Sequence, residues 1–115
     1  AAAEGDRAGA QREFDRVVGV LEAGGTPLAR YLASALCARA EFALGGGARS
    51  AAAADSARCL DLRTGLAGPT SWETAHAQAL LDAARGSGDR TAVAKVAAVL
   101  GERHPKVVAL NRLLP

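Results

Sequence analysis

The residues Pro27–Leu62 read PLARYLASALCARAEFALGGGARSAAAADSARCLDL, two alanine-rich segments on either side of three glycines. Thr26 before Pro27 has the N-cap residue and first-turn proline that commonly open a helix. A run of glycines interrupts a helix, so residues 45–47 mark a turn between two helices. The stretch therefore predicts an αα-hairpin, with helices over about 27–44 and 48–62.

Length and composition favour a single all-α domain. The chain has 115 residues, and a globular chain of this size buries roughly two-thirds of the surface that it exposes when unfolded. The residues are 50% hydrophobic but only 3% aromatic, and alanine supplies about half of the apolar ones. This composition suits close packing of helices better than a β-sandwich.

Similar start and stop signals predict four more helices. Asp6 is an N-cap candidate for a first helix, whose buried stripe would be Phe14, Val17, Val18 and Leu21. Thr70 and Glu73 form a capping box that opens a fourth helix. The predicted elements are a lone helix over 4–23, hairpins over 27–62 and 70–103, and a terminal helix over 105–114, with breaks at 24–26, 45–47, 64–69, 86–88 and 104–105.

The glycine breaks recur at a near-constant spacing. The pattern Gly-x-Arg begins at Gly5, Gly47 and Gly88, which are 42 and 41 residues apart. The second offset places Tyr31 and Trp72, the only tyrosine and tryptophan of the chain, at one repeat position. Self-similarity at such a period is typical of helical repeat proteins. We therefore expect the two aromatic residues to occupy equivalent places in successive hairpins.

The middle hairpin resembles the tetratricopeptide repeat (TPR), with small residues and a glycine turn at Ala40, Gly47, Ala52 and Ser56. The first helix, with Gly5-Asp6, Ala10, Phe14 and Val17, resembles the second helix of such a repeat. The period near 41 exceeds the usual length of about 34 residues and is similar to the longer repeats of kinesin light chains and large bacterial transcriptional regulators. The resemblance implies a TPR-like stack of antiparallel helix hairpins, a short right-handed α-solenoid of about six helices. Ser56 departs from the pattern, which has a large residue there, so another αα-hairpin solenoid is the alternative.

In the family that this sequence resembles, the first helix of each repeat lines a concave groove that holds a partner peptide. Polar residues recur every three or four positions along 27–44 and 70–85, so each set lies on one helix face. The resemblance makes these the candidate groove residues: Arg30, Ser34, Glu41, Ser71, Gln78, Asp82 and Arg85. A solvated helix face is the alternative interpretation.

The resemblance implies a protein–protein interaction module that binds a partner peptide or helix, as part of a larger bacterial regulator or scaffold. The alternative is a dedicated chaperone for an amphipathic secreted protein. We expect neither an enzyme nor a cofactor, because no nucleophile, carboxylate pair or phosphate loop stands out. The first helix lacks a hairpin partner, so we also expect self-association through Phe14 and its neighbours.

The cysteines and histidines do not form a zinc motif. Cys37, Cys59, His76 and His104 each stand alone, whereas structural zinc sites usually draw on closely spaced pairs. Cys37 lies ten positions before Gly47 and Cys59 twelve after it, which brings the two to about the same height in the hairpin. We expect reduced, buried thiols, with a disulfide as the alternative. His76, among alanines, is expected to be a packed histidine.

Charge and hydropathy disfavour nucleic acids and membranes as partners. The net charge is +2, from 14 basic and 12 acidic residues that are mixed along the chain, so no basic surface is indicated. No apolar run reaches the ~18 residues of a membrane span, and no signal pattern opens the chain. We expect a cytoplasmic domain, and the absence of methionine suggests one excised from a longer protein.

Overall fold

A computed structural model of the chain describes residues 2–115, with side-chain detail from Gly5 onward. Six α-helices and one turn of 3-10 helix follow one another in these residues, without a strand. They are α1 (Ala2–Ala23), η1 (Thr26–Leu28), α2 (Ala29–Gly45), α3 (Arg49–Ala67), α4 (Trp72–Arg85), α5 (Thr91–Leu100) and α6 (Pro105–Leu113). The prediction of an all-α stack of about six helices is confirmed.

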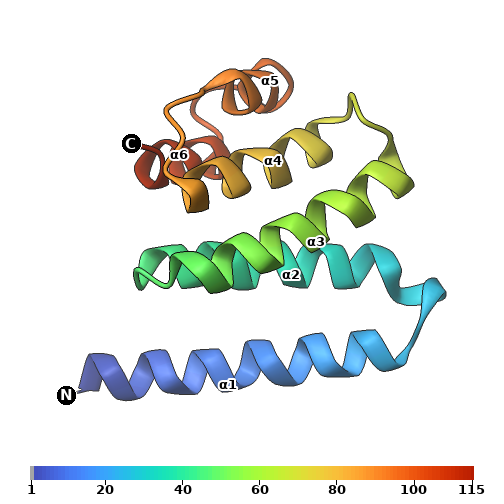
Figure 1. Cartoon of the computed structure of the whole chain (residues 1–115), viewed down its shortest axis with the longest axis vertical. Coiled ribbons are helices and arrows are strands. Elements are labelled where there is room, and N and C mark those ends of the chain that lie inside the picture. Colours follow the sequence, from blue (N-terminus) through green and yellow to red (C-terminus); the bar gives the residue numbers. More distant parts are fainter. Residues whose placement is uncertain (1) are drawn as a thin grey trace.

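The helices form a stack with α1 at one end, α2 and α3 in the middle, and α4 to α6 at the other end (Figure 1). The predicted hairpin is the pair α2 and α3, which pack against each other along their length. Helix α2 also contacts α1 and α4, and α4 contacts α5 and α6 as well as α3. Within residues 2–115, α1 is the one helix with a single extensive neighbour, which is α2.

The core runs through the whole stack. One cluster of buried side chains extends from Val18 in α1 to Leu114 after α6. Its largest fully buried aliphatic members are Leu36, Leu80, Val96, Val107 and Leu110. Each such side chain stabilises the fold by about 1.5–3 kcal/mol when it leaves water. Eight other buried residues are alanines of α2 and α4, whose small side chains let neighbouring helices approach closely.

Helix α3 is longer than the sequence predicted. It continues past Leu62 to Ala67, and the Thr64 hydroxyl donates to the Leu60 carbonyl at 2.7 Å within it. The helix stops at Gly68, which has a φ of 90°, a backbone conformation that glycine adopts without a steric penalty. The loop expected over 64–69 is therefore shorter and lies at 68–71.

Two predicted helix starts are wrong. Helix α1 is already formed at Ala2, so Asp6 lies inside it and is no N-cap. Helix α4 is capped by Ser71, whose Oγ accepts a hydrogen bond from the Thr74 amide at 3.2 Å. The N-cap predicted at Thr70 is thus displaced by one residue, because Ser71 takes the extended conformation of an N-cap, and the amide of Ser71 donates to the Gly68 carbonyl in place of a capping-box side chain.

Two other boundaries differ slightly from the prediction. The turn Thr26–Leu28 is a 3-10 helix, so α2 begins at Ala29 and not at the proline. Helix α5 ends at Leu100 and not near Arg103, because Gly101 has a φ of 93° and cannot continue the helix.

The two hairpins are unequal, and their aromatic residues lie in different surroundings. Helix α3 has 19 residues, whereas its counterpart α5 has 10. The side chain of Tyr31 is 59% exposed, whereas Trp72 is partly buried and packs against the core cluster. The equal spacing in the sequence therefore does not give the two residues equivalent environments.

Candidate functional site

The residues predicted to line one groove border two different cavities. Arg30 and Ser34, on α2, line a cavity with the end of α3 and the first turns of α4 and α6. Gln78 and Asp82, on α4, line a smaller cavity that α5 also lines. Within residues 5–115, neither cavity contains residues of both pairs.

The other predicted groove residues have separate positions. Ser71 caps α4, so its hydroxyl serves the helix start. Glu41 is half-buried on α2, and Arg85 is exposed in the last turn of α4. Gln78 donates a hydrogen bond to Asp82 at 2.9 Å, one turn away on the same helix. The seven residues thus serve several local roles, and only the pair Arg30 and Ser34 and the pair Gln78 and Asp82 each share a cavity.

An apolar groove runs between α1 and α2, outside the set of predicted residues. Its volume is about 540 Å³, within the range of ligand-binding pockets. Its lining is almost entirely carbon, with Glu13 and Ser34 as the polar members: Ala10, Glu13, Phe14, Val17, Ser34, Ala35 and Ala38. Three alanines and two larger apolar side chains therefore leave a shallow apolar channel open to solvent.

The apolar surface extends beyond the groove at the end where α1 turns into α2. Val20 is 58% exposed and lies three residues after Val17 on α1. Tyr31 is 59% exposed and lies four residues before Ala35 on α2. Positions three and four residues apart share a helix face, so both side chains continue the groove lining. We call this surface the α1–α2 apolar surface.

Aromatic contacts hold one end of α1 on α2. The rings of Phe14 and Phe42 lie with their centroids 5.2 Å apart. The Arg7 guanidinium lies 4.1 Å from the centroid of the Phe42 ring and donates to the Phe42 carbonyl at 2.8 Å. Such cation–π and aromatic pairs each contribute on the order of 1 kcal/mol. Phe14 thus contacts Phe42 of α2 and also lines the groove.

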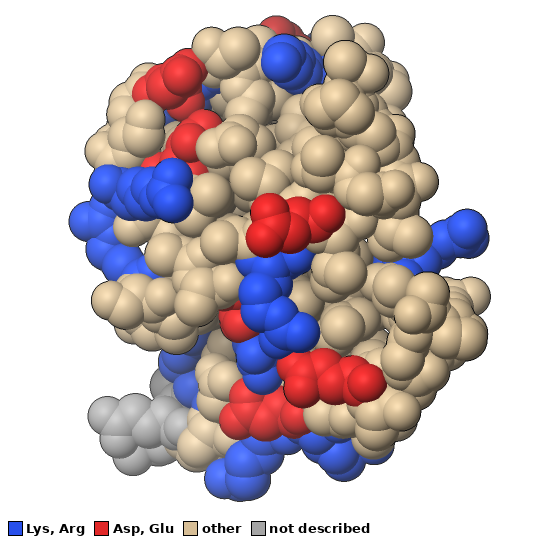
Figure 2. All heavy atoms as spheres, turned by 45° about the vertical axis from the view of Figure 1, so that its right-hand side comes forward, with Lys and Arg blue, Asp and Glu red and all other residues tan. Residues whose placement is uncertain are grey.

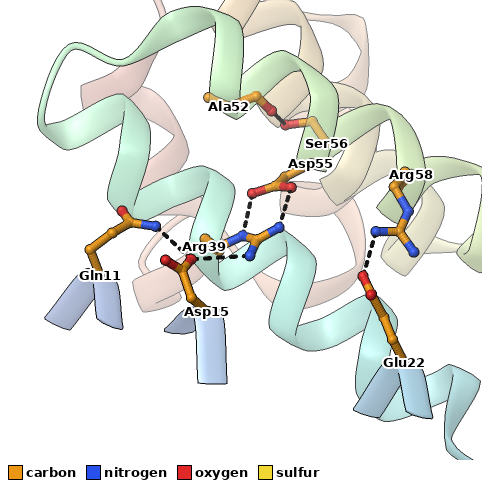
Figure 3. Close-up of polar contacts among 8 residues, drawn as sticks. All are labelled: Gln11, Asp15, Glu22, Arg39, Ala52, Asp55, Ser56 and Arg58. Carbon is orange, nitrogen blue, oxygen red and sulfur yellow. Dashed lines mark hydrogen bonds and ion pairs between the residues drawn. The ribbon is translucent and has the colours of Figure 1, made fainter. Parts of the chain in front are cut away.

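An ion-pair network joins α1, α2 and α3 (Figure 3). Arg39 of α2 makes a two-pronged contact with Asp55 of α3, at 2.7 and 2.9 Å, and reaches Asp15 of α1 at 3.2 Å. Gln11 donates to Asp15 at 2.9 Å. The Asp55 side chain is only 11% exposed, and its hydrogen bonds raise the pKa of Arg39. The network keeps α1 in register with the hairpin beneath it.

The cysteines form a disulfide, contrary to the expected pair of reduced thiols. Cys37 and Cys59 bridge α2 and α3 with their Cα atoms 5.8 Å apart, inside the range that a disulfide allows. Both are buried in the core cluster. The prediction placed them correctly at one height, but it underestimated how closely the alanine-rich faces of this hairpin approach.

His76 is buried, as the sequence predicted, and it contacts a cation. The Arg63 guanidinium donates to His76 Nδ1 at 2.9 Å and to the Glu73 carbonyl at 3.0 Å. Because an arginine can only donate, His76 Nδ1 is the acceptor and the ring is neutral. Burial, with the nearby charges of Arg63 and Lys106, lowers the pKa of His76 to about 3.

The surface charges are dispersed. The residues whose side chains are described also lack a cluster of metal ligands. Blue and red side chains are interspersed on the face drawn in Figure 2. Residues 5–115 contain no group of three or more side chains that could hold a metal ion. None of the helices within residues 2–115 is both long and apolar enough to cross a bilayer.

Comparison with known proteins gives no match to a family model, to a curated protein or to a solved structure.

Proposed function

We propose that the chain is a protein–protein interaction module that binds an amphipathic helix of a partner protein on the α1–α2 apolar surface. The observation that carries this proposal is the largely apolar groove that two neighbouring helices line, beside the exposed side chain of Tyr31. Phe14 and Val17 of this surface are only partly buried and lie outside the set of buried residues that forms the core cluster.

The shape of the surface favours a helix as the occupant. Two adjacent helices form a channel into which the side-chain ridge of a third helix can pack. The small side chains of Ala35 and Ala38 allow such a helix to approach, and Phe14 and Val17 provide the larger contacts. Tyr31 lies at one end of the channel, and tyrosine is frequent at protein interfaces because it combines a large apolar ring with a polar tip.

The position of α1 is in line with the same occupant. Helix α1 packs extensively on α2 alone, whereas each of the other helices in residues 2–115 contacts at least two helices. A partner helix beside α1 would supply a second neighbour. The TPR resemblance of the sequence also favours an interaction role in a larger bacterial regulator or scaffold, but the surface proposed here differs from the concave groove of that family.

The test uses a synthetic amphipathic peptide of about 18 residues with leucines along one face, long enough to become helical once bound. We expect the peptide to gain helical circular dichroism on addition of the protein. The dissociation constant should be roughly 1–100 µM, because a peptide that folds on binding loses conformational entropy. NMR shift changes should concentrate at Ala10, Phe14, Val17, Ala35 and Ala38.

Matched variants locate the binding surface. Ala38→Arg places a charge in the groove and should weaken peptide binding by at least about tenfold, because an unpaired guanidinium is costly in apolar contact. Ala98→Arg makes the same change at an exposed position of α5 and should leave binding unchanged. Equal binding by the two variants, or no gain of helix with either, would contradict the proposal.

The same variants test whether a second copy of the chain can occupy the surface. Sedimentation velocity over increasing concentration should show association that Ala38→Arg abolishes and Ala98→Arg does not, if a second copy occupies the surface. A monomer at every concentration would mean that the groove does not accept a helix from a second copy of the chain. The helix of another protein would then be the occupant.

A further inference from the structure

A second cavity, separate from the apolar groove except for the shared edge at Ser34, lies on an adjacent face of α2. Its volume is about 520 Å³, also within the range of ligand-binding pockets. Four helices meet around it, because the first turns of α2, α4 and α6 and the last turns of α3 all contribute lining residues. Residues far apart in the sequence are therefore brought to one place by the fold.

The lining of this cavity is rich in positive charge. Arg30, Arg63 and Lys106 come from three different helices, and Glu73 is the one acidic residue among the lining residues. Three cations and one carboxylate give a formal charge of +2 at neutral pH. None of the three cations forms a salt bridge with another side chain of residues 5–115. Trp72 adds an aromatic wall beside these charges.

Arg63 is held in place by groups that carry no charge. Its guanidinium donates to the main-chain carbonyl of Glu73 and to the neutral ring of His76. Burial lowers the pKa of Arg63, but the group remains charged because its usual pKa lies far above neutrality. The guanidinium is half-buried and its two hydrogen bonds go to neutral acceptors, so the nearby Glu73 carboxylate is not hydrogen-bonded to it and its position is preorganised for an anion.

We propose that this cavity binds a small phosphate monoester with an apolar or aromatic body. The phosphate would lie among Arg30, Arg63 and Lys106, and the body against Trp72. A phosphate monoester carries a charge of about −1.5 to −2 at neutral pH, which matches the formal +2 of the lining. Arginine forks and lysine ammonium groups are the side chains that most often bind phosphate oxygens. This site is independent of the proposed helix-binding surface.

The assay follows the fluorescence of Trp72, which is the only tryptophan of the chain and lies in the cavity wall. The probe is phenyl phosphate, added to the full chain at low ionic strength. We expect a saturable change in emission that weakens at about 0.5 M salt, because salt screens exposed charges. Inorganic phosphate should compete with the probe, whereas phenol, which has the same ring without the charge, should bind far more weakly.

Charge-removing variants at exposed positions keep the fold intact. Lys106→Gln and Arg30→Gln should each weaken phenyl phosphate binding by about fivefold, the effect of one exposed charge at contact distance in water. Lys95→Gln removes the only other lysine, which lies on α5 and outside this cavity, and should leave binding unchanged.

Three results would overturn the proposal: no saturable change with phenyl phosphate, equal binding of phenol, or an equal loss in Lys95→Gln and Lys106→Gln. The last outcome would mean that the probe responds to the net charge of the protein and not to the cavity. Because the helix-binding test uses a different surface and different variants, either proposal can fail without the other.

Discussion

Acidification should destabilise the protein through His76. In the folded chain the ring is buried and accepts a hydrogen bond from Arg63 at 2.9 Å, and its pKa is lowered to about 3 by burial and by Arg63 and Lys106. In the unfolded chain the same ring has a pKa of about 6.5. Near neutral pH both states hold a neutral ring. As the pH falls below about 6.5, only the unfolded chain takes up the proton, so stability is lost.

The size of the loss follows from the two pKa values. Between about pH 7 and pH 5 the free energy of unfolding should fall by about 2 kcal/mol, from the protonation of the unfolded ring with RT of about 0.59 kcal/mol. The loss continues, at about 1.4 kcal/mol per pH unit, until the pH approaches the folded pKa. The loss of unfolding free energy at pH 5 is the same for any folded-state pKa of His76 below about 4, because the folded ring is then still neutral at pH 5.

The assay is urea unfolding followed by far-UV circular dichroism at about pH 7 and about pH 5, for the wild type and for His76→Gln. Glutamine offers Arg63 a carbonyl acceptor and does not titrate. We expect the pH-dependent loss of about 2 kcal/mol in the wild type to be largely absent from the variant. In the wild type, the positive charges of Arg63 and Lys106 favour the neutral ring of His76. Equal losses in the two proteins would refute the reasoning, because other groups would then be responsible.

Three further outcomes are expected from the packing of the helices. Replacing Cys37 and Cys59 by alanine should lower the free energy of unfolding by about 3 kcal/mol and the melting temperature by about 14 °C, from the loop that the disulfide closes; a melting temperature that is unaffected by reductant would contradict this. Asp55→Asn should cost about 3 kcal/mol in urea unfolding, because Arg39 loses the more buried of its two charged partners; a loss below about 1 kcal/mol would mean that the pair behaves as an exposed one. Ser71→Ala should cost about 1 kcal/mol in the same assay through the lost cap of α4, and no change would assign the cap to another group.

The order of the helices and most of their turns could be predicted from glycine and proline alone, but the helix ends could not. The segment before α4 contains Gly65 and Gly68, and either can end a helix. Only Gly68 takes a positive φ. Gly65 lies inside α3, whose helical hydrogen bonds continue through it. Likewise Thr70 and Ser71 are both good N-cap residues, and the tertiary path of the chain into α4 decides between them.

The geometry of the central hairpin could have predicted more of the polar contacts than it did. Arg39 lies eight positions before Gly47 and Asp55 eight after it, so they meet at one height by the argument that brought Cys37 and Cys59 together. The cavities were not predictable in this way. Arg63 and Lys106 meet only because α6 folds back onto the start of α4, and no periodicity in the sequence reports that packing.

The assumption of equal repeats also explains why the predicted groove residues separated. It placed the polar face that carries Arg30 and the polar face that carries Gln78 on equivalent helices of successive hairpins. Helix α5 is much shorter than α3, and it lines the cavity that Gln78 borders. The two helix faces therefore have different neighbours, although their polar residues recur at the same spacing.

The disulfide has a mechanical consequence. If the two ends of the chain are pulled apart, α1 can peel away and α4 to α6 can unravel, but the bond between Cys37 and Cys59 transmits the force directly past the 22-residue span between them. That span would contribute about 75 Å to a fully extended chain. A single oxidised molecule in an optical trap should therefore reach a contour length shorter by about that amount than a reduced one, with the second half of α2, the glycine turn and the first half of α3 shielded from load.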